Sequence, residues 1–159
     1  MSSIEDFLHS IAYRNLFSYF NHFMAEPLFY VVVVVFALLA VLVVKKKGTK
    51  AAVIASLLLT GVLVLLLKSL YAEPRPCVGL SYCEPDFGFP SGHAALSFAV
   101  AFNTFGTNYF YYFIAFAVLV ALSRVISGLH TFPQIVAGMI LGFIVSTTVN
   151  LVVQKIVSK

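Results

Sequence analysis

Charged residues are scarce in this sequence. Only 10% of its 159 residues are Asp, Glu, Lys or Arg, whereas 61% are hydrophobic. A soluble globular domain usually has about a quarter charged residues, so this composition excludes one. The sequence therefore predicts an integral membrane protein. The chain is long enough for one helical bundle and too short for a second domain, so residues 1–159 are expected to form a single domain.

Several motifs that build common sites are also absent. The sequence has only two cysteines, and neither has neighbouring histidines that would complete a zinc site. It contains no Walker loop, Rossmann turn or other metal-ligand cluster, so we expect no metal and no cofactor. The formal net charge is +4, but the basic residues lie at the ends of apolar runs, which is typical of membrane orientation signals. We therefore expect no nucleic acid partner, and no protein partner is evident.

Apolar runs divide the chain into an expected helical bundle. Residues 1–24 mix aromatic and polar side chains, which predicts an amphipathic helix in the membrane interface, and they lack the features of a signal peptide. The predicted fold class is all-α: a polytopic membrane bundle of about five transmembrane helices within residues 25–153, plus this interfacial helix. The expected spans are residues 28–44, 51–67, 92–105, 109–127 and 131–153.

The distribution of charge predicts the orientation. Lysines cluster at residues 45–50 and near the C-terminus, whereas every acidic residue falls on the opposite side of the expected bundle. Because basic loops face the cytoplasm, the C-terminus is expected inside and the loop of residues 69–89 outside. That loop has only three prolines, fewer than a disordered linker would have, so we expect it to be ordered.

A polar segment, Pro90-Ser91-Gly92-His93, precedes the third expected span. Proline and glycine favour a turn, and Ser91 is a good N-cap. The backbone N–H groups of residues 91–93 would be among the unpaired donors at this helix start, and such an end attracts phosphate. The alternative is that the segment only starts a helix, with His93 at a water interface.

The antiparallel order of the expected spans brings further polar residues to the same face. Ionisable residues near the hydrocarbon boundary are costly and usually functional. A single cation can simply snorkel to the interface, but three cations without an acidic partner on their own helices indicate a multiply charged anion, and phosphate fits best. Two histidines would supply a nucleophile and a proton donor. The converging residues are Lys68, Arg75, His93, Arg124 and His130.

Three segments together resemble the signature motifs of the type-2 phosphatidic acid phosphatase superfamily, which also includes vanadium haloperoxidases. The segments are Lys68-x6-Arg75-Pro76, Pro90-Ser91-Gly92-His93 and Ser123-Arg124-x5-His130, and the match runs from residue 68 to residue 134. The resemblance implies a metal-independent phosphatase in which His130 attacks phosphorus, forming a phosphohistidine, and His93 protonates the leaving group. It also implies that the phosphoryl oxygens are held by Lys68, Arg75, Ser91, Gly92 and Arg124.

One position departs from the family pattern. Where the pattern has an aspartate after the nucleophilic histidine, this chain has Gln134. An aspartate would accept the Nδ1–H of His130 and favour the charged imidazole, whereas a glutamine can accept that hydrogen bond but carries no charge. Thr131 and Gln134 also have the Thr-x-x-Gln form of a capping box, which is the alternative explanation. We hypothesise that Gln134 serves both purposes, or that an acidic loop residue, Glu84 or Asp86, compensates.

The expected outer loop also contains both cysteines, Cys77 and Cys83. An oxidising compartment would permit a disulfide between them, and two free thiols are the alternative.

The resemblance further implies a lipid substrate whose phosphate lies at the outer leaflet. Candidates are lipid A 1-phosphate, undecaprenyl diphosphate, phosphatidylglycerol phosphate and phosphatidate. The short chain and compact loop favour a bacterial envelope lipid, an inner-membrane location and an active site facing the periplasm. Two alternatives remain open. The departure at Gln134 allows a catalytically weak lipid-phosphate binder. A small transporter or channel is the other, although the sequence has no internal repeat and no ionisable residue at mid-span.

Overall fold

The computed structural model describes residues 28–45, 47–79 and 83–157, and within these ranges every regular element is an α-helix. The all-α fold class is therefore confirmed. Each expected span overlaps one helix, whereas the expected interfacial helix of residues 1–24 lies outside the described residues. The helices are α3 (Leu28–Val43), α4 (Lys47–Tyr71), α5 (Gly92–Asn103), α6 (Phe110–Ile126) and α7 (Phe132–Val157).

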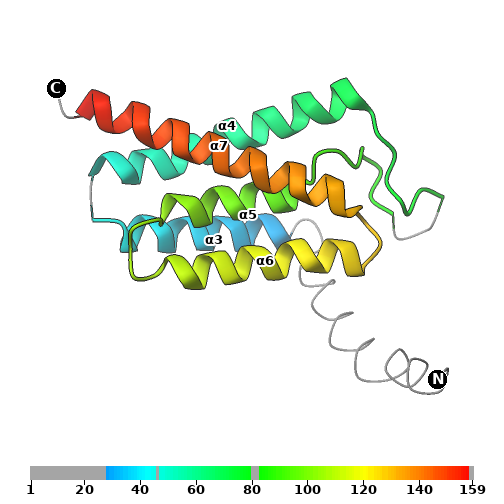
Figure 1. The fold of residues 1–159 in the computed structure, drawn as a ribbon, viewed down its shortest axis with the longest axis horizontal. Coiled ribbons are helices and arrows are strands. Elements are labelled where there is room, and N and C mark those ends of the chain that lie inside the picture. The colour runs from blue at the N-terminus through cyan, green and yellow to red at the C-terminus, as the bar shows by residue number, and fades with distance from the viewer. Residues whose placement is uncertain (1–27, 46, 80–82, 158–159) are drawn as a thin grey trace, which may run out of the picture.

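Helix α5 is the central helix and packs against each of the other four (Figure 1). Most of its residues are buried, among them four alanines, and small side chains allow neighbouring helices to approach closely. The hydroxyl oxygen of Ser91 accepts a hydrogen bond from the backbone N–H of Ala94 at 3.5 Å, so Ser91 caps this helix as expected. Because α5 begins at Gly92, its first turn carries His93 into the interior of the bundle.

Helices α5 and α7 cross at two glycines of α7, Gly138 and Gly142. A Cβ atom at Gly142 would collide with the backbone oxygen of Ala95 and lie 2.9 Å from the backbone nitrogen of Ala99. We expect Gly142→Ala to destabilise the protein by about 1–3 kcal/mol, because overpacking forces the two helices apart. Gly61→Ala, the matched control on α4, adds its methyl group to open space. Thermal unfolding in detergent should show a lower Tm for Gly142→Ala alone, and equal Tm values for both variants would contradict the close crossing.

The helix lengths bear on how the chain crosses the membrane. Two helical stretches in the described residues, Gly48–Tyr71 and Phe132–Val157, are long and apolar enough to span a bilayer. Large apolar side chains are exposed on the outer faces of α3, α4, α6 and α7, as lipid contact requires. Helix α5 has 12 residues and a length of about 18 Å, whereas the hydrocarbon core is about 30 Å thick. The count of five spans is therefore not confirmed, because α5 is a short helix enclosed by the others.

One end of the bundle gathers the polar segments. Residues 72–79 and 83–91, which follow α4, and the turn of residues 127–131 between α6 and α7 all lie there, at the right in Figure 1. The backbone N–H of Ser91 donates to the carbonyl oxygen of Gln134 at 3.0 Å, which ties the start of α5 to the start of α7. The ends of α4 and α6 therefore meet the starts of α5 and α7 at this end.

Candidate active site

The five ionisable residues expected to converge are brought together at this end of the bundle. Arg75 Nη1 lies 2.8 Å from His130 Nε2, and Arg124 Nη1 lies 3.5 Å from His93 Nε2. Each of these residues, and Lys68 with them, is less than a tenth exposed. They therefore face the interior of the protein and do not snorkel along its surface.

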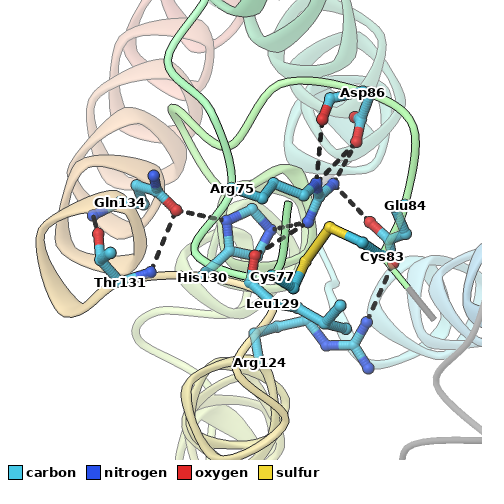
Figure 2. The surroundings of a disulfide bond; sticks show 10 residues. All are labelled: Arg75, Cys77, Cys83, Glu84, Asp86, Arg124, Leu129, His130, Thr131 and Gln134. Carbon is cyan, nitrogen blue, oxygen red and sulfur yellow. Dashed lines mark hydrogen bonds and ion pairs between the residues drawn. A yellow bond between two sulfur atoms is a disulfide. The ribbon is translucent and has the colours of Figure 1, made fainter. Parts of the chain in front are cut away.

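His130 is held between an arginine and an amide (Figure 2). Its Nδ1 lies 3.0 Å from Gln134 Oε1, while Arg75 approaches Nε2 from the other side. A guanidinium can only donate hydrogen bonds, so Nε2 must be the acceptor and the proton must sit on Nδ1. The lone pair of Nε2 therefore points toward the cation cluster, which is the tautomer that a nucleophilic histidine needs.

Burial of the imidazole is the main reason that the pKa of His130 falls from 6.5 to about 3. The positive charge of Arg75 lowers this pKa further, and the hydrogen bond with Gln134 opposes the shift only in part. His130 lies in the turn between α6 and α7. In the free protein the imidazole is therefore neutral at physiological pH, and its lone pair is available.

Two carboxylates from the loop neutralise the cations. Asp86 pairs with both Lys68 and Arg75, and Glu84 pairs with Arg75 and lies 3.5 Å from Arg124. The sequence interpretation considered only partners on the same helices and did not anticipate these ion pairs. Burial alone would raise the pKa of Asp86, but hydrogen bonds from Lys68 and Arg75 outweigh it and hold this pKa below its ordinary value of 3.8. Asp86 is therefore ionised and occupies donors that a phosphate would use.

A cavity of about 160 Å³ opens beside Lys68, Arg75 and His93, whereas His130 and Arg124 do not line it. Its polar wall includes Lys68, Arg75 and His93, and its apolar wall includes Val64 and Leu65 of α4. Gly92 also lines the cavity. The expectation that the backbone N–H of residue 91 is unpaired is wrong, because it donates to the carbonyl oxygen of Gln134. Ser91 thus caps α5 and binds the start of α7 in this structure. Gly92, and not Ser91, lines the cavity.

A disulfide between Cys77 and Cys83 closes a ring directly before the two carboxylates in the same loop (Figure 2). Cys77 is buried, and Glu84 directly follows Cys83. The disulfide therefore lies next to the ion pair of Glu84 with Arg75. Among the described residues, no group of three or more His, Cys, Asp or Glu side chains could hold a metal ion.

Comparison with known proteins decides the family. A model of the PAP2 superfamily matches residues 49–158. The chain belongs to the PAP2 superfamily. The resemblance seen in the three motifs is therefore confirmed, and the protein is a membrane-bound lipid phosphatase, a hydrolase that acts on phosphoric monoester bonds.

Two solved structures have a similar fold. The transmembrane PAP2-type phosphatidylglycerolphosphate phosphatase from Bacillus subtilis has a TM-score of 0.68 at 19% identity, and the match covers 94% of this chain and 81% of that one. LpxE from Aquifex aeolicus has a TM-score of 0.60 at 25% identity, and the match covers 89% of this chain and 97% of that one. No curated protein matches the chain in sequence.

Gln134, which replaces the aspartate of the PAP2 pattern, makes both contacts expected of it. Its Oε1 accepts a hydrogen bond from the backbone N–H of Thr131 at 3.1 Å and lies 3.0 Å from His130 Nδ1. Its backbone N–H donates to Thr131 Oγ1 at 3.5 Å, which completes the capping box. The hypothesis that Glu84 or Asp86 compensates for the missing charge gains no support, because both contact the cations. The carboxylate that contacts Gln134 is Glu73, at 2.7 Å from Nε2 to Oε1.

Two neighbours of the site were not anticipated from the PAP2 motifs. Glu73 is one, and Phe29 of α3 is the other: its ring stacks on the imidazole of His93 with centroids 3.9 Å apart. Phe29 lies in a uniformly apolar run, which offers no signal of a site. Glu73 lies between Lys68 and Arg75 in the first motif. Its position beside two cations was the signal in the sequence that could have marked it as a neighbour of the site.

The low pKa of His130 predicts the acid side of the pH profile. The nucleophile must be unprotonated, so its protonation would make kcat/KM fall at low pH, with a midpoint near the pKa of about 3. We expect no acid limb near 6.5 that belongs to the protein. Measuring kcat/KM with two substrates whose phosphate pKa values differ separates the assignments, because a limb from the substrate moves with the substrate. A fixed acid limb near 6.5 would contradict the buried, neutral imidazole.

Proposed function

We propose that this PAP2 protein hydrolyses the phosphate monoester or diphosphate of an envelope lipid without a metal, through a phosphohistidine on His130. One observation carries the proposal: the Nε2 lone pair of His130 faces a buried cluster of cations, with Arg75 Nη1 at 2.8 Å. Once Arg75 leaves Nε2, this lone pair would attack a phosphorus atom whose oxygens are bound by the buried Lys68, Arg75 and Arg124, and Gly92 lines the neighbouring cavity. Ser91 supports this wall as the cap of α5.

Substrate binding first exchanges one anion for another. The lipid phosphate displaces the carboxylates of Asp86 and Glu84 from the cations, and Arg75 moves from Nε2 to a phosphoryl oxygen. Side-chain exposure of Asp86 is 46%, so its carboxylate can turn into solvent without crossing packed structure. The three cations then stabilise the charge that develops on the phosphoryl group in the transition state.

The chemical steps then follow from the two histidines. Nε2 of His130 forms a bond to phosphorus while the bond from phosphorus to the lipid oxygen breaks, and the bonding electron pair leaves with that oxygen. His93 protonates the departing oxygen, and stacking on Phe29 fixes the plane of its ring. His93 then takes a proton from a water molecule that attacks the phosphohistidine, which releases phosphate and restores His130.

Competition between Asp86 and phosphate gives a specific expectation. Asp86→Asn should lower the inhibition constant of inorganic phosphate by about two- to fivefold, because a half-exposed ion pair contributes only modestly and the phosphate no longer displaces a charge. Asp86→Glu is the matched control that keeps the charge and should bind phosphate no more tightly than the wild type. Product-inhibition kinetics measure both constants. Weaker phosphate inhibition in Asp86→Asn would contradict the exchange of anions.

The proposal also covers the substrate class and the side of the membrane on which the site lies. The disulfide in the site loop suits an oxidising compartment, and the basic residues at the opposite end suit the cytoplasm. We therefore place the site at the periplasmic face of a bacterial inner membrane, with the C-terminus in the cytoplasm. The apolar wall of the cavity suits a lipid chain. The substrates to compare are lipid A 1-phosphate, undecaprenyl diphosphate, phosphatidylglycerol phosphate, as used by the Bacillus subtilis protein, and phosphatidate.

Phosphate release from this panel of lipids tests the proposal. We expect turnover that persists in excess chelator, is inhibited by vanadate and is lost in His130→Ala. A lipid-phosphate binder would bind the panel without releasing phosphate, and a channel or transporter would move an ion or solute across liposomes without hydrolysis. Either result, or activity that is lost on chelation, would overturn the proposed function.

A further inference from the structure

We propose that Glu73 is a positioning residue for His130 and acts through the side-chain amide of Gln134. Two hydrogen bonds connect the three side chains: His130 Nδ1 lies 3.0 Å from Gln134 Oε1, and Gln134 Nε2 donates to Glu73 Oε1 at 2.7 Å. The amide therefore joins the nucleophile to a carboxylate, although the residue directly beside the histidine is uncharged. The inference rests on the proposed function, because it assigns a role within the same reaction.

The neighbours of the amide fix its orientation. The backbone N–H of Thr131, which can only donate, lies 3.1 Å from Oε1, and the carboxylate of Glu73 contacts Nε2. Flipping the amide would place two donors face to face at Thr131 and two acceptors face to face at Glu73. The oxygen must therefore face His130, which holds the proton on Nδ1 and leaves the lone pair on Nε2.

The backbone at Glu73 is tied to the loop. The backbone oxygen of Glu73 accepts a hydrogen bond from the N–H of Gly88 at 2.8 Å, while its exposed side chain contacts Gln134. Gly88 also lies directly against the amide, because a Cβ atom at this position would lie 2.6 Å from Gln134 Nε2. Residues 73 and 88 thus form one side of the space that Gln134 occupies. Gln134 is only 1% exposed, so its amide has little room for another orientation.

The contacts from His130 through Gln134 to Glu73 form a relay, which matters most when His130 becomes charged. Formation of the Nε2–phosphorus bond leaves the imidazole with substituents on both nitrogens and a positive charge. The Nδ1–H then donates more strongly to Gln134 Oε1, and the polarised amide donates more strongly from Nε2 to the anionic Glu73. Glu73 thereby supplies the negative charge that an aspartate at position 134 would supply directly. Its contribution belongs to the transition state and to the intermediate, and not to substrate binding.

The first experiment removes the charge of Glu73 and keeps its shape. We expect Glu73→Gln to lower kcat by about three- to tenfold with KM within about twofold, because the exposed charge of Glu73 is partly screened and its effect belongs to the transition state. Glu73→Asp should recover part of the loss. Glu73→Asp is also the matched control, because it shortens the side chain but keeps the charge. A purely steric effect would lower kcat at least as much in Glu73→Asp, whereas the relay predicts the larger loss of kcat in Glu73→Gln.

The second experiment uses the residue through which Glu73 acts. In a Gln134→Asp background the carboxylate accepts the Nδ1–H directly and repels Glu73, so adding Glu73→Gln should leave kcat unchanged or raise it. A second readout is the ratio of the vanadate to the phosphate inhibition constants. Vanadate bonds to the nucleophile and phosphate product does not, so Glu73→Gln should raise this ratio by about threefold or more.

The outcomes distinguish the two proposals. An active wild type whose kcat and inhibitor ratio are unchanged by Glu73→Gln overturns the relay and leaves the proposed function standing. An equal loss of kcat from Glu73→Gln in both backgrounds also overturns the relay, because the effect then does not pass through Gln134. A wild type that binds the lipid phosphates without turnover overturns the proposed function, and the relay with it.

Discussion

Replacing His130 with alanine is expected to lower kcat for a lipid phosphate by at least about 10⁴-fold, the scale of loss when a covalent nucleophile is removed. His130 is buried and fixed by contacts on both ring nitrogens, and alanine has no lone pair to take the place of Nε2. The measurement is phosphate release under saturating lipid substrate. The cations remain in the variant, so substrate should still bind.

Retained binding is the control that makes this result specific. His130→Ala removes the acceptor of Arg75, but the side chains of Lys68 and Arg124 are untouched. Equilibrium binding of the lipid phosphate should therefore change by less than about tenfold. Loss of binding together with turnover would point to a collapsed site, and residual turnover above about 1% of the wild-type value would show that His130 is not the nucleophile.

Substitution of His93 is expected to have an effect that depends on the leaving group. For an alkoxide leaving group, as in a lipid phosphate, His93→Gln should slow the first turnover by about 10²- to 10⁴-fold, because the departing oxygen is no longer protonated. For p-nitrophenyl phosphate, whose leaving group needs no proton, the first turnover should slow by less than about tenfold. Rapid mixing measures both first-turnover rates.

The second half of the reaction provides a check on this assignment. His93 also activates the water that hydrolyses the phosphohistidine, so p-nitrophenol release by His93→Gln should show a burst followed by a slow steady state. Phe29→Leu is a useful companion, because it removes the ring stacked on His93 and keeps the imidazole itself. Equal losses for both leaving groups in His93→Gln would contradict a role in protonation.

Much of the fold could be predicted because the apolar runs are clearly bounded. Each expected span overlaps a helix, and the capping box at Thr131 lies where the residues indicated. The role of α5 could not be predicted in the same way. Its 12 residues read as an apolar run like the others, and only its contacts with all four neighbours show that it is the central helix. Glycines on α7 allow α5 to pack closely against it. The local sequence of α5 does not indicate which helix it packs against.

The site followed from the sequence as far as helix ends determine it. Lys68, His93, Arg124 and His130 lie at or near helix ends, so antiparallel order alone brings them to one end of the bundle. The roles of the loop acids could not be derived, because they depend on long-range contacts. Asp86 reaches back to Lys68, and Glu73 reaches Gln134 across 61 positions of sequence. The disulfide and the Gly88 hydrogen bond help to fix the course of the loop that carries these acids. That course cannot be derived from the local sequence.

The most direct test of the account is to locate the covalent phosphoryl group. His93→Gln should form the phosphoenzyme from p-nitrophenyl phosphate and hydrolyse it slowly, so the intermediate accumulates. Quenching at alkaline pH, where phosphohistidine is stable, followed by peptide mass spectrometry should then place one phosphoryl group on His130. A phosphoryl group on any other residue, or product release with no covalent phosphoenzyme, would contradict the mechanism.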